Sequence, residues 1–528
     1  MQPREAQQPG AGRRSQVQRL LALLAVVGIA ACCLAGVLWV TRDGAGVSRD
    51  SVDYLGAAQS IRSGEGVAVP FATYNELPPA DITVQQPVAM TTFPPLYPTV
   101  LAGVSSVTGT SPAGTARVVG ALALPVTVLL AATLAWRRTR SALWPPLAAA
   151  ALVLQPDILI VHSMVWSEPL TITLVLGLML ALTEYVDRPR AWLLGAGGCL
   201  AGAAVMTRYV AVATIPALIV AIALATPRPR RWRRYLVALL PALAPIAVWA
   251  VRNASQASGA ARAQASWHPP TWGAAGAAAG QLLDWVSPAG VLRALGCVAL
   301  LALAASCVAA AQRGEARAIL SASAVVGVTA ASFAAVLLVT WFLFDAALST
   351  DFRVLSPLSV LTVVLAACSA GSAQHLWAAP WRLLGLAVVA VLGVVGCVRA
   401  ATAYDGLPAR LDYNAPPWLG SPTLALAESL PAGDLVVTNA PDFMWVRTGR
   451  VTVPEPRTYI AVSSRTNTAF ASELDAIRHV VIHKGHGWLV LWNGGDRPYL
   501  PMLDQLTATL HSRVVETTSD GAVLELLP

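Results

Sequence analysis

The feature that most constrains this chain is a succession of long apolar runs separated by short segments rich in arginine. Hydrophobic residues make up 56% of the 528 residues and charged residues only 12%. Soluble globular domains carry about 25% charged residues. An apolar stretch of about 20 residues is long enough to cross the hydrocarbon core of a bilayer as a helix. The chain is therefore predicted to be an all-α polytopic membrane bundle.

Eleven apolar runs are predicted to span the membrane, within a transmembrane domain of residues 20–403. The first run, residues 20–40, is too long for the apolar part of a secretory signal, and it follows Arg13, Arg14 and Arg19. We interpret it as a signal anchor that follows a cytoplasmic tail of residues 1–19. The other ten runs are centred on residues 113–136, 142–160, 168–186, 191–206, 209–226, 235–251, 289–311, 318–344, 355–371 and 383–400.

The arginines predict the orientation of the bundle. When the loops are assigned alternately to two sides, every loop on one side carries arginine, which marks that side as cytoplasmic. These residues are Arg137, Arg138, Arg140, Arg188, Arg190, Arg228, Arg230, Arg231, Arg233, Arg234, Arg313, Arg317 and Arg382. The other side receives the first external loop, residues 41–112, and everything after residue 400. Because the net charge of +8 is spread over loops, it does not indicate nucleic-acid binding.

Residues 404–528 are predicted to form a small extracytoplasmic α/β domain, because they follow an odd number of spans. Helices are expected at 422–430 and 470–478, and the proline-rich segment 413–418 is interpreted as the linker. Short β-type runs occur at residues 435–438, 480–482, 488–492, 514–517 and 522–526.

The first external loop opens with the acidic and aromatic segment Asp50-Ser51-Val52-Asp53-Tyr54. Charge close to hydrocarbon is costly and commonly marks a working site. Asp50 can cap a helix running to about Ser63, with Asp53 on the same face, and from this segment alone a capping role is the favoured interpretation. The apolar positions Val52, Leu55, Ala58 and Ile61 are spaced as in a helix lying on the membrane surface.

Four segments together resemble one enzyme family. The order Asp50, Tyr54, Ala58, Gly64, Gly66 and then Phe93-Pro94-Pro95-Leu96-Tyr97-Pro98 resembles the first periplasmic loop of the GT-C glycosyltransferases. These enzymes use polyprenyl-phosphate sugars and include protein O-mannosyltransferases and the lipid A aminoarabinose transferase. Residues 162–170, 207–209 and 351–357 also resemble segments of this family. The resemblance implies a GT-C-like bundle of about eleven transmembrane helices in a bacterial cell membrane.

The resemblance also implies an activity, namely inverting transfer of a hexose or pentose from a polyprenyl-phosphate donor to an extracytoplasmic glycan, lipid or protein. Asp50 takes the place of the family's catalytic or metal-associated carboxylate and is the expected base; whether a divalent metal takes part stays open. Many members have Glu where this chain has Ser51, which leaves Asp53 as a partner. The expected catalytic residues are Asp50, Asp53 and Glu168. The expected phosphate ligands are Arg353 and then Arg208, and the expected substrate contacts are Tyr54, His162, Tyr97 and Tyr209.

Physical chemistry is compatible with these roles, and alternatives remain. A partly desolvated carboxylate can serve as a base with a raised pKa, and an arginine can stabilise a departing phosphate. Arg208 and Arg353 could equally be interfacial anchors, and Glu168 before Pro169 is also a favourable first-turn acid.

Two other functions of the whole protein compete with the transferase, namely a transporter with a periplasmic domain and a non-catalytic binding relative. The sequence contains no evident internal repeat, and its charges gather at the external interface, which favours the transferase.

Overall fold

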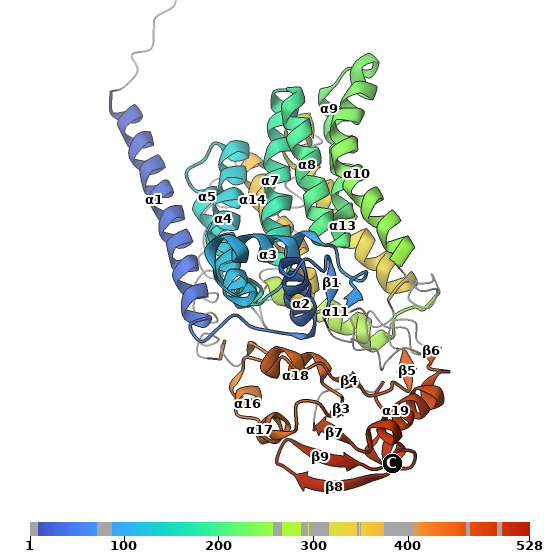
Figure 1. Cartoon of the computed structure of the whole chain (residues 1–528). Helices are drawn as coiled ribbons and strands as arrows, with labels where there is room; N and C mark the ends of the chain where they lie inside the picture. Colours follow the sequence, from blue (N-terminus) through green and yellow to red (C-terminus); the bar gives the residue numbers. More distant parts are fainter. Residues whose placement is uncertain are drawn as a thin grey trace, which may run out of the picture.

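A computed structural model describes residues 9–70, 87–256, 267–286, 316–345, 350–373, 410–460, 465–493 and 499–528, with residues 294, 348, 406 and 407. The chain forms a helical bundle with a small α/β domain packed against one end (Figure 1). The predicted span 383–400 lies outside the described residues, and so does 289–311 apart from residue 294. Both stay predictions.

Six described helices are long and apolar enough to cross a membrane. They are α1 (Pro9–Val40), α4 (Pro112–Thr139), α7 (Glu168–Asp187), α10 (Arg231–Gln256), α13 (Ala316–Leu343) and α14 (Phe352–Ala373). The pair α5 (Trp144–Val153) and α6 (Pro156–Ser163) is bent by 68° where Pro156 begins the second helix, and it has the length and composition of a broken seventh span or of a re-entrant loop. Shorter apolar helices are α3 (Leu96–Thr108), α8 (Ala191–Thr207), η2 (Tyr209–Thr214) and α9 (Ile215–Ala225).

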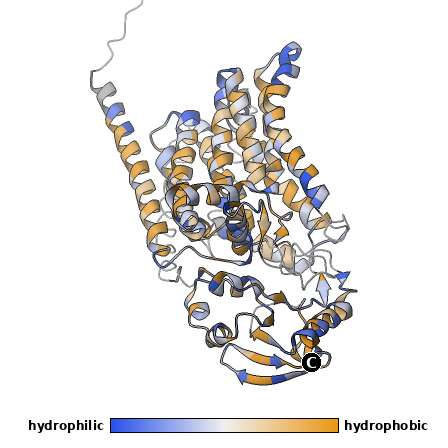
Figure 2. Ribbon diagram, in the orientation of Figure 1, coloured by the Kyte–Doolittle hydropathy of each residue, from blue (hydrophilic) through white to orange (hydrophobic). Residues whose placement is uncertain are grey.

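The helices of the bundle consist mainly of hydrophobic residues (Figure 2), and many of these side chains are exposed on its outside. Leu21, Leu240 and Val251 are 59%, 66% and 71% exposed, as expected where lipid replaces water as the solvent. Inside the bundle, small residues let the helices approach closely. A Cβ atom at Gly198 of α8 would lie 2.2 Å from the carbonyl oxygen of Ala238 of α10. Such contacts are typical of helix packing in membranes.

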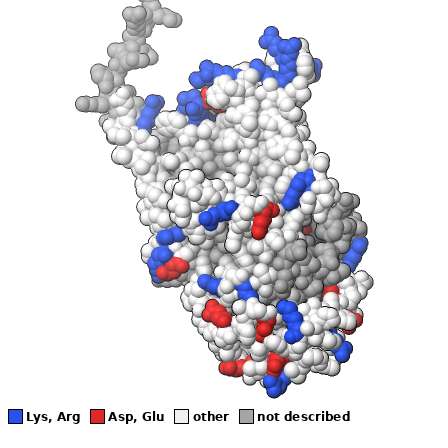
Figure 3. Space-filling view, viewed as in Figure 1, with Lys and Arg blue, Asp and Glu red and all other residues white. Residues whose placement is uncertain are grey.

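Arginine marks the end of the bundle that lies away from the α/β domain (Figure 3). Arg137 and Arg138 lie in the last turn of α4, and Arg188 follows α7. Arg190 precedes α8, and a cluster of five arginines surrounds the start of α10. The arginines expected on one side of the membrane therefore lie at one end of the bundle wherever they are described.

The C-terminal domain is built on a five-stranded mixed sheet with the order β4-β3-β7-β9-β8. Its strands are β3 (Leu435–Thr438), β4 (Val453–Pro454), β7 (Gly487–Trp492), β8 (Ser512–Thr517) and β9 (Gly521–Leu526). Strand β3 pairs in parallel with β4 and β7, whereas β7, β9 and β8 are antiparallel. The helices are α16 (Pro416–Leu419), α17 (Pro422–Ser429), α18 (Pro441–Thr448), α19 (Phe470–Lys484) and α20 (Leu503–Thr507). The bundle with a C-terminal α/β domain confirms the predicted fold class.

One predicted strand, residues 480–482, is wrong. These residues form the last turns of α19, which runs six residues beyond the predicted end at residue 478. Leu474, Ile477 and Val481 are spaced by three and four residues, so one helical face packs on the sheet, and all three are buried. The local run of β-branched residues therefore gives way to tertiary packing.

Three expectations about the segments near the α/β domain are also corrected. Helix α2 (Arg49–Arg62) begins after Ser48, whose backbone N–H donates to Ser51 Oγ at 3.0 Å, so Asp50 lies in the first turn and is not the cap. Val52, Leu55 and Ala58 are buried inside the protein, so α2 does not lie on a membrane surface. Segment 413–418 is no linker, because Tyr413 and Trp418 pack on Phe443 of the α/β domain and residues 416–418 belong to α16.

Candidate active site

The site lies where the start of α2, the N-terminal ends of α7 and α14, and the α/β domain meet. Segment 45–47, which leads into α2, holds these parts together through backbone hydrogen bonds on both sides. Gly46 donates to Ser163 at 2.9 Å, and Tyr413 donates to Val47 at 2.9 Å. The segment before α7 and the entry to the α/β domain are thereby fixed relative to the first turn of α2.

This close approach requires a glycine at position 46. A Cβ atom there would lie 2.0 Å from Met164 Sδ and 3.2 Å from Leu411 Cα. A side chain would force the two flanking segments apart, and one of the obstructing atoms belongs to the backbone. Gly46 therefore sets the distance between the bundle and the α/β domain beside the site.

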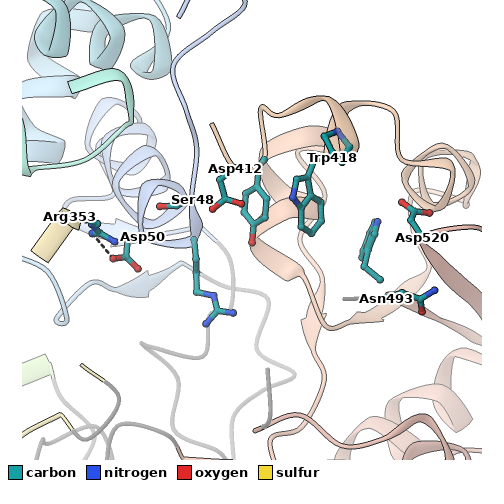
Figure 4. A pocket seen from close by; sticks show the side chains of 11 residues that line it. Ser48, Asp50, Arg353, Asp412, Trp418, Asn493 and Asp520 are labelled. Atoms are coloured by element: carbon teal, nitrogen blue, oxygen red, sulfur yellow. Dashed lines mark ion pairs between the residues drawn. The ribbon is translucent and has the colours of Figure 1, made fainter. Parts of the chain in front are cut away.

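Arg353 lies at the centre of a buried charge cluster. Its Nη2 lies 2.7 Å from Asp50 Oδ2, and its Nε donates to Glu168 Oε1 at 2.6 Å. Its guanidinium lies over the Trp166 ring, 4.6 Å from the ring centroid. Arg208 Nη1 donates to the same Glu168 oxygen, also at 2.6 Å. One carboxylate oxygen thus holds two arginines, and one of them bridges to Asp50 (Figure 4).

Each member of the cluster comes from a helix end at this side of the bundle. Glu168 is the first residue of α7, where the helix dipole favours negative charge, and Pro169 needs no hydrogen bond there. Arg353 is the second residue of α14, and the Asp351 carboxylate accepts from the N–H of Val354 at 3.1 Å to cap that helix. Arg208 lies in extended backbone between α8 and η2. Helix ends therefore bring together residues far apart in the chain.

Asp50 is held in its ionised form. Burial alone would raise the pKa of its carboxyl group, but the contact with Arg353 outweighs burial, and Arg208 and Arg49 add to that effect. The net result is a pKa below the ordinary aspartate value. The expectation of a raised pKa at Asp50 is therefore wrong for this arrangement, since it considered burial without the arginine.

A cavity of about 590 Å³ opens beside this cluster, between the bundle and the α/β domain. That volume lies within the range of small-molecule sites, about 300–1,000 Å³. Asp50 and Arg353 form part of one wall, together with Ser48 and Arg49 (Figure 4). The opposite wall belongs to the α/β domain and its entry segment, and its residues are Asp412, Tyr413, Pro417, Trp418, Trp492, Asn493 and Asp520.

The structure brings four of the nine expected site residues into one cluster, namely Asp50, Glu168, Arg208 and Arg353. Glu168 is fully buried, so it lies behind Arg353 and away from the cavity. The other five residues do not line the cavity, and their predicted roles stay predictions. They are Asp53, Tyr54, Tyr97, His162 and Tyr209.

Tyr54 and Tyr97 pack beneath the site. Their rings make an edge contact with centroids 5.1 Å apart, and the hydroxyl of Tyr54 lies 3.1 Å from Ser167 Oγ. Burial raises the pKa of Tyr54 well above its ordinary value, so its hydroxyl stays protonated. Both rings hold α2 against α3 and the start of α7.

Asp53, His162 and Tyr209 take different places. Asp53 is buried on α2, and His162 is buried on α6 with its Nδ1 2.8 Å from the carbonyl oxygen of Ile158. Tyr209 is 41% exposed, and its hydroxyl accepts from Trp249 Nε1 at 2.8 Å. It therefore contacts α10 and lies outside the charge cluster.

Sequence reasoning missed two kinds of cavity residue. Arg49 directly precedes Asp50, so its position already signalled a second cation; its Nη2 donates to Tyr499 Oη at 2.6 Å. Trp418 lies in the segment interpreted as a linker, and Asp412 directly precedes that segment. No local pattern there indicates that the chain returns to the start of α2.

The described residues offer no group of three or more His, Cys, Asp or Glu side chains suited to a metal ion. Asp50 and Glu168, the two acids of the charge cluster, are engaged by arginine. This set does not fit a divalent metal, and no step below is assigned to one.

The sequence matches no family model and no curated protein. The structure is similar to ArnT from Cupriavidus metallidurans bound to undecaprenyl phosphate, with a TM-score of 0.60 and 14% identity over 95% of this chain and 97% of that chain. It is also similar to the apo state of the same protein, with a TM-score of 0.58, 14% identity and the same coverage. The chain therefore has the GT-C fold that its motifs predict.

Proposed function

We propose that this chain is an integral-membrane glycosyltransferase of the extracytoplasmic face of a bacterial cell membrane. It takes a sugar from a polyprenyl-phosphate donor and transfers it to an acceptor hydroxyl. The observation that carries the proposal is the cavity wall in which Asp50 is paired with Arg353 at the mouth of the bundle. The similar fold of ArnT, whose structure contains undecaprenyl phosphate, supports this class of donor.

Arg353 is the proposed ligand of the donor phosphate. A guanidinium group has five N–H donors, and the contacts with Asp50 and Glu168 use two of them. Its side chain lines the cavity, so a phosphate entering from the bilayer side can reach the remaining donors. Arginine suits a leaving phosphate because it keeps its charge and offers a planar pair of donors.

Glu168 is proposed as a positioning residue in place of the catalytic role expected from the sequence. It is fully buried and accepts from both Arg208 and Arg353 through one oxygen. This contact fixes the planes of two guanidinium groups before any substrate binds. Preorganised charge of this kind stabilises a developing anion without reorganisation during the reaction.

Donor binding would convert Asp50 into an effective base. In the free protein Arg353 keeps the pKa of Asp50 low, so its carboxylate accepts protons poorly. A phosphate bound to Arg353 weakens that attraction and adds a second negative charge, and both effects raise the pKa of Asp50. The base therefore gains strength only when a donor is present.

The proposed reaction is a single displacement. Asp50 takes the proton of the acceptor hydroxyl, whose oxygen bonds to the anomeric carbon of the donor sugar. The bond between that carbon and the phosphate oxygen breaks, and polyprenyl phosphate leaves with the electron pair. Arg353 stabilises the charge on the departing phosphate. One displacement inverts the configuration at the anomeric carbon.

A donor panel tests the proposed function. The purified full-length protein in lipid nanodiscs is given radiolabelled sugars linked to polyprenyl phosphate, to polyprenyl diphosphate or to a nucleotide. We expect cleavage of the bond between sugar and phosphate in at least one member of the first class only, with the sugar transferred to a supplied hydroxyl acceptor or to water. Binding of intact donor without cleavage would support a transporter or a binding relative instead.

A further inference from the structure

The cavity wall opposite Asp50 combines aromatic rings with polar side chains. Trp418 and Asn493 lie along it, away from the paired Asp50 and Arg353, and Asp412 lies at its near end, next to Ser48 (Figure 4). None of these three side chains takes part in the proposed chemistry. The wall belongs to the α/β domain, whereas the donor's lipid must enter from the bundle.

The Trp418 ring is held in a fixed position. It makes edge contacts with Tyr413 and Phe443, with centroids 5.0 Å and 4.6 Å apart, and Phe443 in turn contacts Trp492 at 5.3 Å. Trp418 is only half-buried, so part of the ring faces the cavity. A preorganised ring offers apolar contact area at a low entropic cost.

Asp412 has an unusual backbone conformation for a residue with a side chain. Its φ angle is +51°, in the left-handed region, which aspartate and asparagine adopt more readily than most residues. The pairing of segment 411–413 with Val47 holds this conformation beside the cavity. Backbone strain of this kind is concentrated at functional sites.

Asp520 has a different part in the same wall. Its carboxylate accepts from Ser421 Oγ at 2.5 Å and from the hydroxyls of Thr423 and Thr518 at 2.7 Å and 2.9 Å. These bonds tie α17 to the start of β9, and they occupy both carboxylate oxygens. Asp520 therefore supports the wall. Asp412 and Asn493 are the other polar side chains of this wall that line the cavity.

The aromatic and polar side chains of this wall match the chemistry of a carbohydrate. A sugar ring presents an apolar face of C–H groups and an edge of hydroxyls, which suit an aromatic ring flanked by a carboxylate and an amide. A peptide acceptor would be expected to pair its backbone with an exposed strand edge, and an acyl chain would require an apolar wall. Because Arg353 fixes the donor on the other wall, the ring bound here belongs to the acceptor.

We propose that the acceptor is a carbohydrate, bound in a subsite in which Trp418 stacks on a sugar ring and Asp412 and Asn493 bind its hydroxyls. This inference rests on the proposed function in one respect, namely that the bound sugar is the acceptor of the reaction. The subsite itself is a binding site and is testable without turnover.

Saturation-transfer NMR on the full-length protein in nanodiscs tests the subsite. The probes are methyl α-D-mannopyranoside, methyl α-D-arabinofuranoside and, as a non-sugar hydroxyl, N-acetylthreonine amide. We expect saturation of the ring protons of at least one glycoside. Trp418→Leu and Asp412→Asn should each weaken its binding by about tenfold, the ordinary value of one lost ring contact or hydrogen bond. Asparagine keeps the left-handed backbone, so loss at position 412 reports on charge.

Trp272→Leu is the matched control, because Trp272 is 94% exposed and lies outside the cavity lining. It should bind the glycosides as the parent does. Three results would overturn the proposal: no glycoside signal, preference for the threonine derivative, or a signal lost in Arg353→Lys but kept in Trp418→Leu, which would assign the ring to the donor. A protein that binds glycosides at Trp418 yet consumes no polyprenyl-phosphate sugar would refute the proposed function and leave the subsite standing.

Discussion

Arg353→Lys separates phosphate binding from membrane anchoring. Lysine keeps one positive charge and a long stem that can reach an interface, but it loses the planar fork of the guanidinium. In the structure that fork spans Asp50 and Glu168 at 2.7 Å and 2.6 Å while its face covers Trp166. A single ammonium group cannot reproduce this geometry.

The size of the effect follows from these contacts. Losing one hydrogen bond between charged groups costs about 1.5–3 kcal/mol. Losing the guanidinium contact with Trp166 costs about 0.5–1 kcal/mol more. The sum, about 2–4 kcal/mol, corresponds to a loss of roughly 30- to 1000-fold in kcat/KM for the donor.

The assay is donor titration at equal amounts of folded parent and variant. Arg252→Lys is the matched control, because Arg252 also lies over a tryptophan, 4.6 Å from the Trp249 ring, but donates to the backbone carbonyls of Met90 and Val67 away from the cavity. It should keep kcat/KM within a few-fold of the parent. Indistinguishable donor kinetics for Arg353→Lys would refute the phosphate role and favour an anchor.

Three further predictions concern positioning, pH and topology. Glu168→Gln keeps an acceptor oxygen but removes the charge that holds Arg208 and Arg353. The free energy of unfolding should fall by about 2–4 kcal/mol, which lowers the melting temperature, and turnover should also fall. An unchanged melting curve would contradict the positioning role of Glu168. Burial raises the pKa of Glu473 to about 7, although Asn467 and Arg457 partly offset this effect. Protonated Glu473 therefore stabilises the folded state fully below the unfolded pKa of about 4.3, and this stabilisation is lost as the pH rises through about 7. Glu473→Gln should therefore raise the melting temperature at about pH 8 and leave it nearly unchanged at about pH 4, below the unfolded pKa. An equal change at both pH values would contradict this direction. Cysteines placed at the exposed positions Ser63 and Ser519 should react with an impermeant thiol reagent in intact cells, and one at Arg190 should not; opposite labelling of the first two would refute the proposed topology.

The bundle could be predicted from the sequence because the bilayer imposes a strong constraint. Each span must satisfy its backbone internally, so apolar length alone locates most helices. The cost of placing charge in the bilayer also explains where the site lies. Asp50, Glu168, Arg208 and Arg353 are charged, so they were expected at helix ends on one side, and the structure places them in one cluster there.

The features that sequence reasoning missed depend on contacts between distant segments. The pKa of Asp50 is set by Arg353, which no local pattern connects to α2. Segment 411–413 reaches the site through backbone hydrogen bonds with residue 47, and any sequence can form such bonds. Residues 480–482 are helical because Val481 completes a buried face, which outweighs their β propensity.

The most direct test of the account is the turnover of Asp50→Asn with a polyprenyl-phosphate sugar that the parent consumes. Asparagine keeps the size of the side chain and removes its capacity to accept a proton, while Arg353 and Glu168 stay in contact. The account predicts that kcat falls by roughly 10² or more while the amount of folded protein stays that of the parent. A kcat within a few-fold of the parent would contradict the assignment of Asp50 as the base.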